Sequence, residues 1–260
     1  MSFHASQVLP DVWQIADPMG VCCTLLVGRE QALLVDTGYG LDDLPTFVRT
    51  LTDRPLRVLL THGHHDHALG AKDFPEVWLF PEDRPVYDTY TREPWRGRAT
   101  DSARRNGIAL DRDAFLAAAM PDTLPPPETV ELGGLIPRIM RCPGHTPGSA
   151  VVWVPERALL LTGDDWNPVT WCFFKEALPV WAYRENVRKL AALPFQNVLC
   201  SHRESLWSRE DFTSFIDGLT DERIREAEPS EEGAEQGIDT VTAHPAPGQI
   251  LVFDRAKAGL

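Results

Sequence analysis

The chain has 260 residues, of which 43% are hydrophobic and 24% are charged, as is ordinary for a globular protein. This length is enough to bury a sizeable core, as one large domain or as two small ones. The formal net charge of −13 disfavours general binding to nucleic acid, because such binding depends on clustered Lys and Arg.

Signals for membranes or secretion are missing from the sequence pattern. No stretch approaches the roughly 20 apolar residues that a spanning helix needs, and the N-terminal residues do not resemble a secretory signal. The cysteines are irregularly spaced and odd in number, which favours reduced thiols over a disulfide framework: Cys22, Cys23, Cys142, Cys172 and Cys200. We therefore expect a cytoplasmic protein with no membrane partner.

The first third of the chain alternates between strand and helix patterns. Short, apolar segments punctuated by Pro and Gly predict strands at residues 12–17, 22–28, 31–38, 56–61 and 76–80. Helical spacing of apolar residues predicts a helix within 41–53 and a short one at 68–74. This order of elements indicates an α/β layered fold.

Residues 81–127 differ in composition and predict an insertion. They are rich in Arg, Asp and Pro, and the clearest helix pattern among them is Asp111–Met120. Five arginines lie within residues 91–107, and we interpret them as a solvated face or an anion contact rather than a groove for RNA. The insertion is either a lid that shapes specificity or a peripheral decoration.

The second half repeats the mixture of strands and helices. Strands are predicted at residues 129–132, 136–142, 149–155, 157–164, 197–201 and 249–253, and helices at 178–193 and 209–228. The acidic segment 228–237 is predicted to be a mobile linker. We interpret residues 1–260 as a single domain.

Residues 61–70, "THGHHDHALG", follow a predicted buried strand and carry four histidines and an aspartate within six positions. Such a stretch could be a polar loop or an unspecific histidine tract. It could also be a metal site, because neutral imidazole is a common ligand for zinc and other first-row metals. The stretch alone does not decide between these interpretations.

Three further polar residues follow apolar runs, where an α/β sheet exposes its functional groups. His145 lies in the loop "PGHTPGS", Asp164 ends "LLLTGD", and His202 follows "NVLCS". Each alone could be a turn or capping residue. Together with the cluster they make seven candidate ligands: His62, His64, Asp66, His67, His145, Asp164 and His202. Such a mixed set of nitrogen and oxygen donors is what two adjacent metal ions need.

The order of these motifs resembles the metallo-β-lactamase superfamily. The likeness runs from about residue 8 to residue 205 and includes "LLVDTG" at Leu33–Gly38. It implies an α/β fold, the four-layered αββα sandwich of the metallo-β-lactamase type, with the partly helical insertion at about 81–127. It also implies two divalent metal ions, with zinc preferred and iron or manganese as alternatives.

The resemblance assigns the ligands to two sites. It implies that His62, His64 and His145 hold the first metal and that Asp66, His67 and His202 hold the second, with Asp164 bridging both. The position of Asp164 distinguishes branches of the family. An aspartate there resembles the glyoxalase II and lactonase branch, whereas lactamases of the main branch resemble a pattern with a cysteine at this position. The likeness further implies that Asp36 supports the ligands from behind.

Other polar residues and cysteines in or near the motifs are not expected to bind metal or to react. We expect His65 to be a surface or supporting residue, Asp165 to be a turn or cap, and the Cys142 thiol to be a packing group rather than a nucleophile. His4 and His244 lie outside every motif and are expected to be solvated.

The resemblance and the ligand set favour hydrolysis of a small-molecule ester, thioester or lactone. Two cations that share a water lower its pKa to near neutral, which supplies hydroxide to attack a carbonyl carbon. Asp66 would orient this nucleophile and move a proton. The alternatives are an iron-dependent redox enzyme of the same fold (a persulfide dioxygenase, or an oxygen or nitric oxide reductase), a β-lactam or phosphodiester hydrolase, and a non-catalytic binding module.

The segment after Asp164 is rich in aromatic residues, "DWNPVTWCFFKEALPVW". It could line an apolar substrate pocket or could simply pack beneath a helix. Trp166 and Trp171 are the candidates for substrate contact, because they are nearest to the ligand in sequence. Oligomeric state is left open.

Overall fold

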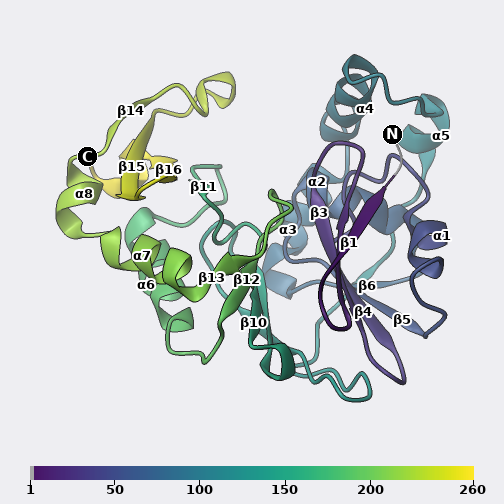
Figure 1. Cartoon of the computed structure of the whole chain (residues 1–260). Helices are drawn as coiled ribbons and strands as arrows, with labels where there is room; N and C mark the ends of the chain where they lie inside the picture. Colours follow the sequence, from purple (N-terminus) through teal and green to yellow (C-terminus); the bar gives the residue numbers. More distant parts are fainter. Residues whose placement is uncertain (1–2) are drawn as a thin grey trace.

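The computed structural model describes residues 3–260, which form three β-sheets flanked by helices (Figure 1). The first sheet has its strands in sequence order: β1 (His4–Leu9), β2 (Val12–Ala16), β3 (Cys22–Val27), β4 (Ala32–Val35), β5 (Leu56–Leu59), β6 (Val77–Trp78) and β7 (Thr123–Leu124). The second has the order β13-β12-β10-β9-β8: β8 (Arg138–Arg141), β9 (Ala150–Val154), β10 (Leu159–Leu161), β12 (Asn197–Leu199) and β13 (Trp207–Ser208). The third has the order β11-β16-β15-β14: β11 (Val169–Cys172), β14 (Glu228–Ser230), β15 (Thr240–Ala246) and β16 (Gln249–Asp254).

The helices are short and lie mostly between strands. The α-helices are α1 (Leu44–Arg49), α2 (His65–Ala68), α3 (Arg84–Tyr90), α4 (Trp95–Arg105), α5 (Arg112–Ala117), α6 (Val180–Leu190), α7 (Arg209–Gly218), α8 (Asp221–Arg225) and α9 (Arg255–Ala258). Four 3₁₀ turns are η1 (Leu69–Asp73), η2 (Pro81–Asp83), η3 (Pro155–Arg157) and η4 (Ala234–Gln236). Within residues 3–260, no helix has the length and apolar character required to cross a membrane.

The two faces of the first sheet pack against different partners, because successive side chains of a strand point to opposite faces. In β4, Leu33 and Val35 belong to a buried cluster that also contains Leu161 of the second sheet. Leu34, between them, belongs to a cluster that contains Val48 of α1. One face of this sheet is therefore covered by a sheet and the other by helices.

The second sheet shows the same alternation from the other side. In β10, Leu159 and Leu161 lie in the cluster shared with the first sheet, whereas Leu160 packs with Val187 of α6 and Phe215 of α7. The layers therefore follow the order helices, sheet, sheet, helices. This arrangement confirms the predicted α/β sandwich of four layers.

The sequence predicted that the acidic segment 228–237 is a mobile linker, but part of it forms a strand. It begins with β14, which pairs with β15 in antiparallel register and forms the edge of the third sheet. The register places Glu228 opposite Thr242 and Ser230 opposite Thr240. The prediction failed because it relied on the acidic composition of the segment, and exposed edge strands often carry charged residues.

The insertion contains more helix than the sequence predicted. Helices α3 and α4 precede α5, which is the one helix that the pattern at 111–120 had indicated. The Arg-rich segment forms α4, and Arg96 within it is buried and donates hydrogen bonds to the carbonyls of Phe115 and Ala118. Arg96 therefore ties α4 to the end of α5, and the expectation of a wholly solvated arginine face is wrong for this residue.

Trp166 lies in the hydrophobic core rather than in a pocket. Its side chain is 0% exposed, and its ring packs edge-on against Trp207, Phe212 and Phe215. The expectation that Trp166 contacts substrate is therefore wrong. Its place in "GDDW" carries it under α7, where the burial of aromatic area stabilises the fold.

We expect Trp166→Ala to lower the free energy of unfolding by about 3–5 kcal/mol, because it removes a large buried ring and leaves a cavity. Urea denaturation measures the change. Trp171→Ala is the matched control, since the Trp171 side chain is partly exposed and should contribute less to stability. An unfolding midpoint that is equal in the two variants would contradict the core assignment of Trp166.

Candidate metal centre

Four strands from the two packed sheets end in the same region. β4 and β5 are parallel neighbours in the first sheet, and β10 and β12 are parallel neighbours in the second. The segments that follow these strands carry Asp36, the 62–67 cluster, Asp164 and His202. Functional groups of α/β folds gather at the carboxyl ends of parallel strands, and the packing of the two sheets brings these ends together.

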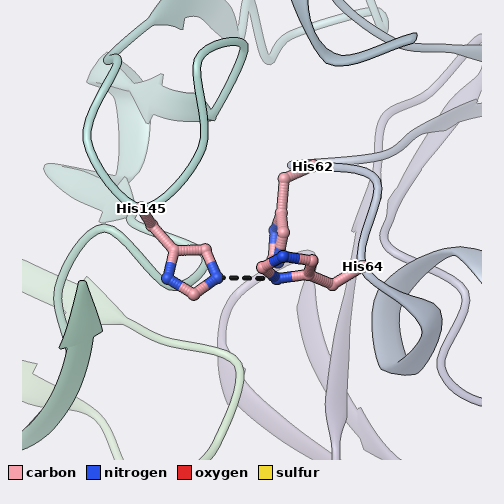
Figure 2. Close-up of side chains that lie close together, drawn as sticks. All are labelled: His62, His64 and His145. Carbon is pink, nitrogen blue, oxygen red and sulfur yellow. Dashed lines mark hydrogen bonds between the residues drawn. The ribbon is translucent and has the colours of Figure 1, made fainter. Parts of the chain in front are cut away.

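Three buried imidazoles form the first cluster. His62 and His64 follow β5, and His145 lies in the loop between β8 and β9. One ring nitrogen of each lies within 4.8 Å of the others. Figure 2 shows one ring nitrogen of His145 directed at a ring nitrogen of His64, with His62 beside His64.

Hydrogen-bond partners determine which nitrogens of His145 and His64 are bare. His145 Nδ1 lies 2.6 Å from the carbonyl oxygen of Trp171, and His64 Nε2 lies 2.5 Å from a carboxylate oxygen of Glu176. Both oxygens only accept, so each of these nitrogens carries its hydrogen. His145 Nε2 and His64 Nδ1 therefore present lone pairs to each other across 2.9 Å. Two facing lone pairs are a poor neutral contact but suitable donors for a cation.

His62 is oriented in the same manner. The hydroxyl of Thr61 lies 2.9 Å and 3.0 Å from the two Asp36 carboxylate oxygens, to which it donates. That hydroxyl can then accept from His62 Nδ1, 3.0 Å away. His62 Nε2 is left buried with no hydrogen-bond partner among residues 3–260. The first cluster thus offers three bare imidazole nitrogens, a donor set that fits a zinc-type ion.

The second cluster combines one carboxylate with two imidazoles. Ligand atoms of Asp66, His67 and His202 lie within 4.8 Å of one another. Asp164 lies between the clusters, because its Oδ2 atom is 3.0 Å from His202 Nε2, 3.4 Å from His67 Nε2 and 3.7 Å from His145 Nε2. The structure therefore brings all seven predicted ligands together, and ligand atoms of His62, His67 and Asp164 also lie within 4.8 Å of one another, which joins the two clusters.

Asp36 lies behind both clusters. It accepts hydrogen bonds from the backbone N–H of Thr61 at 2.7 Å and from His67 Nδ1 at 3.0 Å. Its backbone adopts a left-handed φ of 65°, which is uncommon for residues other than glycine and more accessible to Asp than to most. The strand-end turn thereby directs this carboxylate at the ligands, as expected from the resemblance.

Burial and neighbouring charges set the protonation of the ligands. Burial holds the pKa of His62 well below its usual range and lowers the pKa of His145 to about 4, so both are neutral donors. Burial opposes ionisation of Asp66 and Asp164, but nearby imidazoles hold the pKa of each carboxyl well below its usual range, His67 foremost for Asp66 and His202 foremost for Asp164. Neutral imidazole and ionised carboxylate are the forms that bind metal.

Asp165 does more than form a turn. It is 1% exposed and accepts a hydrogen bond from the backbone N–H of His145 at 3.1 Å. Burial, with Asp164 and Asp83 nearby, raises its pKa well above the usual range for a carboxyl. Asp165 therefore holds the loop of His145 from behind, while its neighbour Asp164 faces the clusters.

A pocket of about 370 Å³ opens over the clusters. Its walls are mainly aromatic and come from separate segments: Tyr39, His65, Tyr90, Trp95, Trp171 and Phe174. Asn167, Val169 and Arg203 complete the lining around the ligands. Trp171 lines the pocket as the sequence suggested, whereas Trp166 does not, for the reason given above.

The sequence of this chain matches the model of a known protein family. The profile described as the metallo-beta-lactamase superfamily matches residues 16–164, which is more than half of the chain. The chain belongs to the metallo-beta-lactamase superfamily. The four-layered fold and the His and Asp side chains at the strand ends agree with that assignment.

Curated relatives of this superfamily member include hydrolases. The hydroxyacylglutathione hydrolase of Cereibacter sphaeroides is 26% identical over 191 residues, which cover 72% of this chain and 64% of that protein. The acyl-coenzyme A thioesterase of Gallus gallus is 27% identical over 165 residues, which cover 55% of this chain and 60% of that protein. The chain thus spans less than two thirds of the length of these relatives.

Solved structures with this fold are similar across most of the chain. A β-lactamase domain protein from Burkholderia ambifaria has a TM-score of 0.62 at 19% identity, covering 96% of this chain and 94% of that one. A protein crystallised in a di-iron-bound form has a TM-score of 0.51 at 24% identity, covering 73% of this chain and 90% of that one. These likenesses show the fold.

Several site residues were not predicted from the sequence. His65 was expected at the surface or in support, but its ring packs against Tyr39 and Trp95 and lines the pocket. Tyr90 and Glu176 contact His64 from segments that no motif marks. Only the concentration of aromatic residues after Asp164 signalled this part of the site.

We expect Asp164→Asn to lose bound metal and Asp165→Asn to keep it, because only Asp164 faces both clusters. The measurement is metal content by mass spectrometry after loading and dialysis, with about two ions expected in the unmodified chain. The two variants are matched neighbours with the same chemical change. Equal metal loss in both, or none in either, would contradict the assignment of Asp164.

Proposed function

We propose that the protein is a dinuclear metallo-hydrolase that cleaves a small ester, thioester or lactone. The observation that carries this proposal is the set of bare imidazole nitrogens and ionised carboxylates at the floor of an aromatic pocket. The hydrolase and thioesterase relatives support hydrolysis in general terms and do not choose among the three substrate types.

The ligands would be divided between two ions. His62, His64 and His145 would hold the first, and Asp66, His67 and His202 the second, with Asp164 shared. The donor set fits zinc, because imidazole nitrogen and carboxylate oxygen are both established ligands of this ion. When bound, such ions polarise a carbonyl oxygen and lower the pKa of water.

The protein's own groups would orient the reactants. Asp66 is an ionised carboxylate at the pocket floor and would hold and move the proton of the attacking water. Asp36 and Asp165 would keep the ligands of the two clusters in place from behind. The Cys142 thiol is buried in the hydrophobic core, and its pKa is raised well above its usual range by burial, so it is a packing group.

The pocket walls favour an apolar acyl or ring group. Trp171 and Phe174 form one side, and Tyr90 and Trp95 from the insertion form another. The insertion would therefore shape specificity as part of the pocket wall rather than as a peripheral decoration. Among residues 3–260, Arg203 is the sole Lys or Arg in the pocket lining, which gives little attraction for a polyanionic substrate.

Trp171→Ala and Trp95→Ala should each raise KM for an apolar substrate several-fold, because each removes an aromatic wall while leaving the ligands in place. The measurement is steady-state kinetics after a screen of lactones, acyl thioesters, aryl esters, β-lactams and phosphodiesters. We expect the highest kcat/KM within the first three classes. A preference for β-lactams or phosphodiesters would overturn the substrate class.

An iron-dependent redox enzyme of the same fold is the second candidate, since a structural neighbour was crystallised with two irons. We expect protein purified without added metal to contain zinc and to lack a visible absorption band. Metal analysis and the optical spectrum measure this. Stoichiometric iron with a visible band would favour the redox alternative over hydrolysis.

A further inference from the structure

Glu176 contacts a candidate metal ligand from a distant part of the sequence. It lies in the turn between β11 and α6, and its Oε1 atom is 2.5 Å from His64 Nε2. Its side chain is only 17% exposed. This is a short, charge-assisted hydrogen bond, the strong kind that fixes a ring in one orientation.

The His64 ring also lies between two aromatic side chains, one of which comes from the insertion. The centroid of the Tyr90 ring lies 4.4 Å from the centroid of the His64 ring, and the centroid of the Phe174 ring lies 4.9 Å from it. The His64 imidazole is thus enclosed by two aromatic rings and by the Glu176 carboxylate.

We infer that Glu176 is a positioning residue that fixes His64 for the first metal ion. With Nε2–H committed to Glu176, the bare Nδ1 atom faces His145 and His62. The inference rests on the proposed function, because it assumes that this cluster binds metal. It goes further by assigning the support of one site, and of one ligand, to a residue outside every family motif of this sequence.

The effect should be confined to one of the two sites. Glu176 contacts His64 of the first cluster, whereas His67 of the second cluster is held by Asp36. A carboxylate that accepts the N–H of the other ring nitrogen of a ligating imidazole typically contributes about 10- to 100-fold in metal affinity. Loss of Glu176 should therefore weaken one binding step and leave the other unchanged.

The experiment compares Glu176→Leu, Glu176→Gln and Glu204→Gln with the unmodified chain. Leucine removes the acceptor, while glutamine keeps an acceptor oxygen and removes the charge. Glu204 is exposed and next to the pocket-lining Arg203, so Glu204→Gln controls for loss of one negative charge near the site. The readout is a zinc titration in competition with a chromophoric chelator, which resolves two affinities.

We expect Glu176→Leu to weaken one zinc site by about 10- to 100-fold, Glu176→Gln to weaken the same site less, and Glu204→Gln to match the unmodified chain. Unfolding of the metal-free proteins by urea reports folding separately, and Glu176→Gln keeps the test valid if the leucine variant fails to fold. Two unchanged affinities in Glu176→Leu, or equal weakening of both, would overturn the positioning role. An unmodified chain that binds no zinc would instead overturn the proposed function.

Discussion

The buried carboxylate of Asp36 is the interaction on which the rest of the centre depends. It receives the backbone N–H and the hydroxyl of Thr61, the Nδ1–H of His67 and, at 3.4 Å, the hydroxyl of Ser201. An unpaired carboxylate at this depth would be strongly destabilising, so these partners must be present together. Because they come from the ends of β5 and β12 and from α2, one side chain links both sheets and both ligand clusters.

Carboxylates lie both within the two clusters and directly behind them. Asp36, Asp66, Asp164 and Glu176 surround imidazoles of which His62 and His145 have pKa values lowered by burial and are neutral. Carboxylates in burial are paired or bind cations, because isolated buried charges are very costly. Burial opposes a charge on His67, yet Asp164 and Asp66 raise its pKa well above the usual range. A metal ion that binds His67 would replace the second proton of its imidazole and release that proton.

The sequence predicted which residues gather at the candidate centre, because their positions depend on local features. Each ligand follows an apolar strand by a few residues, and the order of motifs suffices to collect them at one edge. The pocket walls depend instead on how distant segments pack. Tyr39 comes from the turn after β4, whereas Tyr90 and Trp95 come from the insertion. Trp166 lies five residues from Trp171 yet packs in the core. No periodicity distinguishes those two tryptophans, since only the path of the chain after Asp164 turns one inward and the other toward solvent.

Substrate pocket and metal support meet in one segment, residues 171–176. The carbonyl of Trp171 holds His145 while its ring lines the pocket, and the carboxylate of Glu176 holds His64 beside the pocket-lining Phe174. A ligand that packs on Trp171 or Phe174 therefore contacts the segment that orients two imidazoles of the first cluster. Linkage is reciprocal, so any shift of this segment on binding an apolar group would change first-site affinity, and occupancy of that site would change affinity for the apolar group by the same factor.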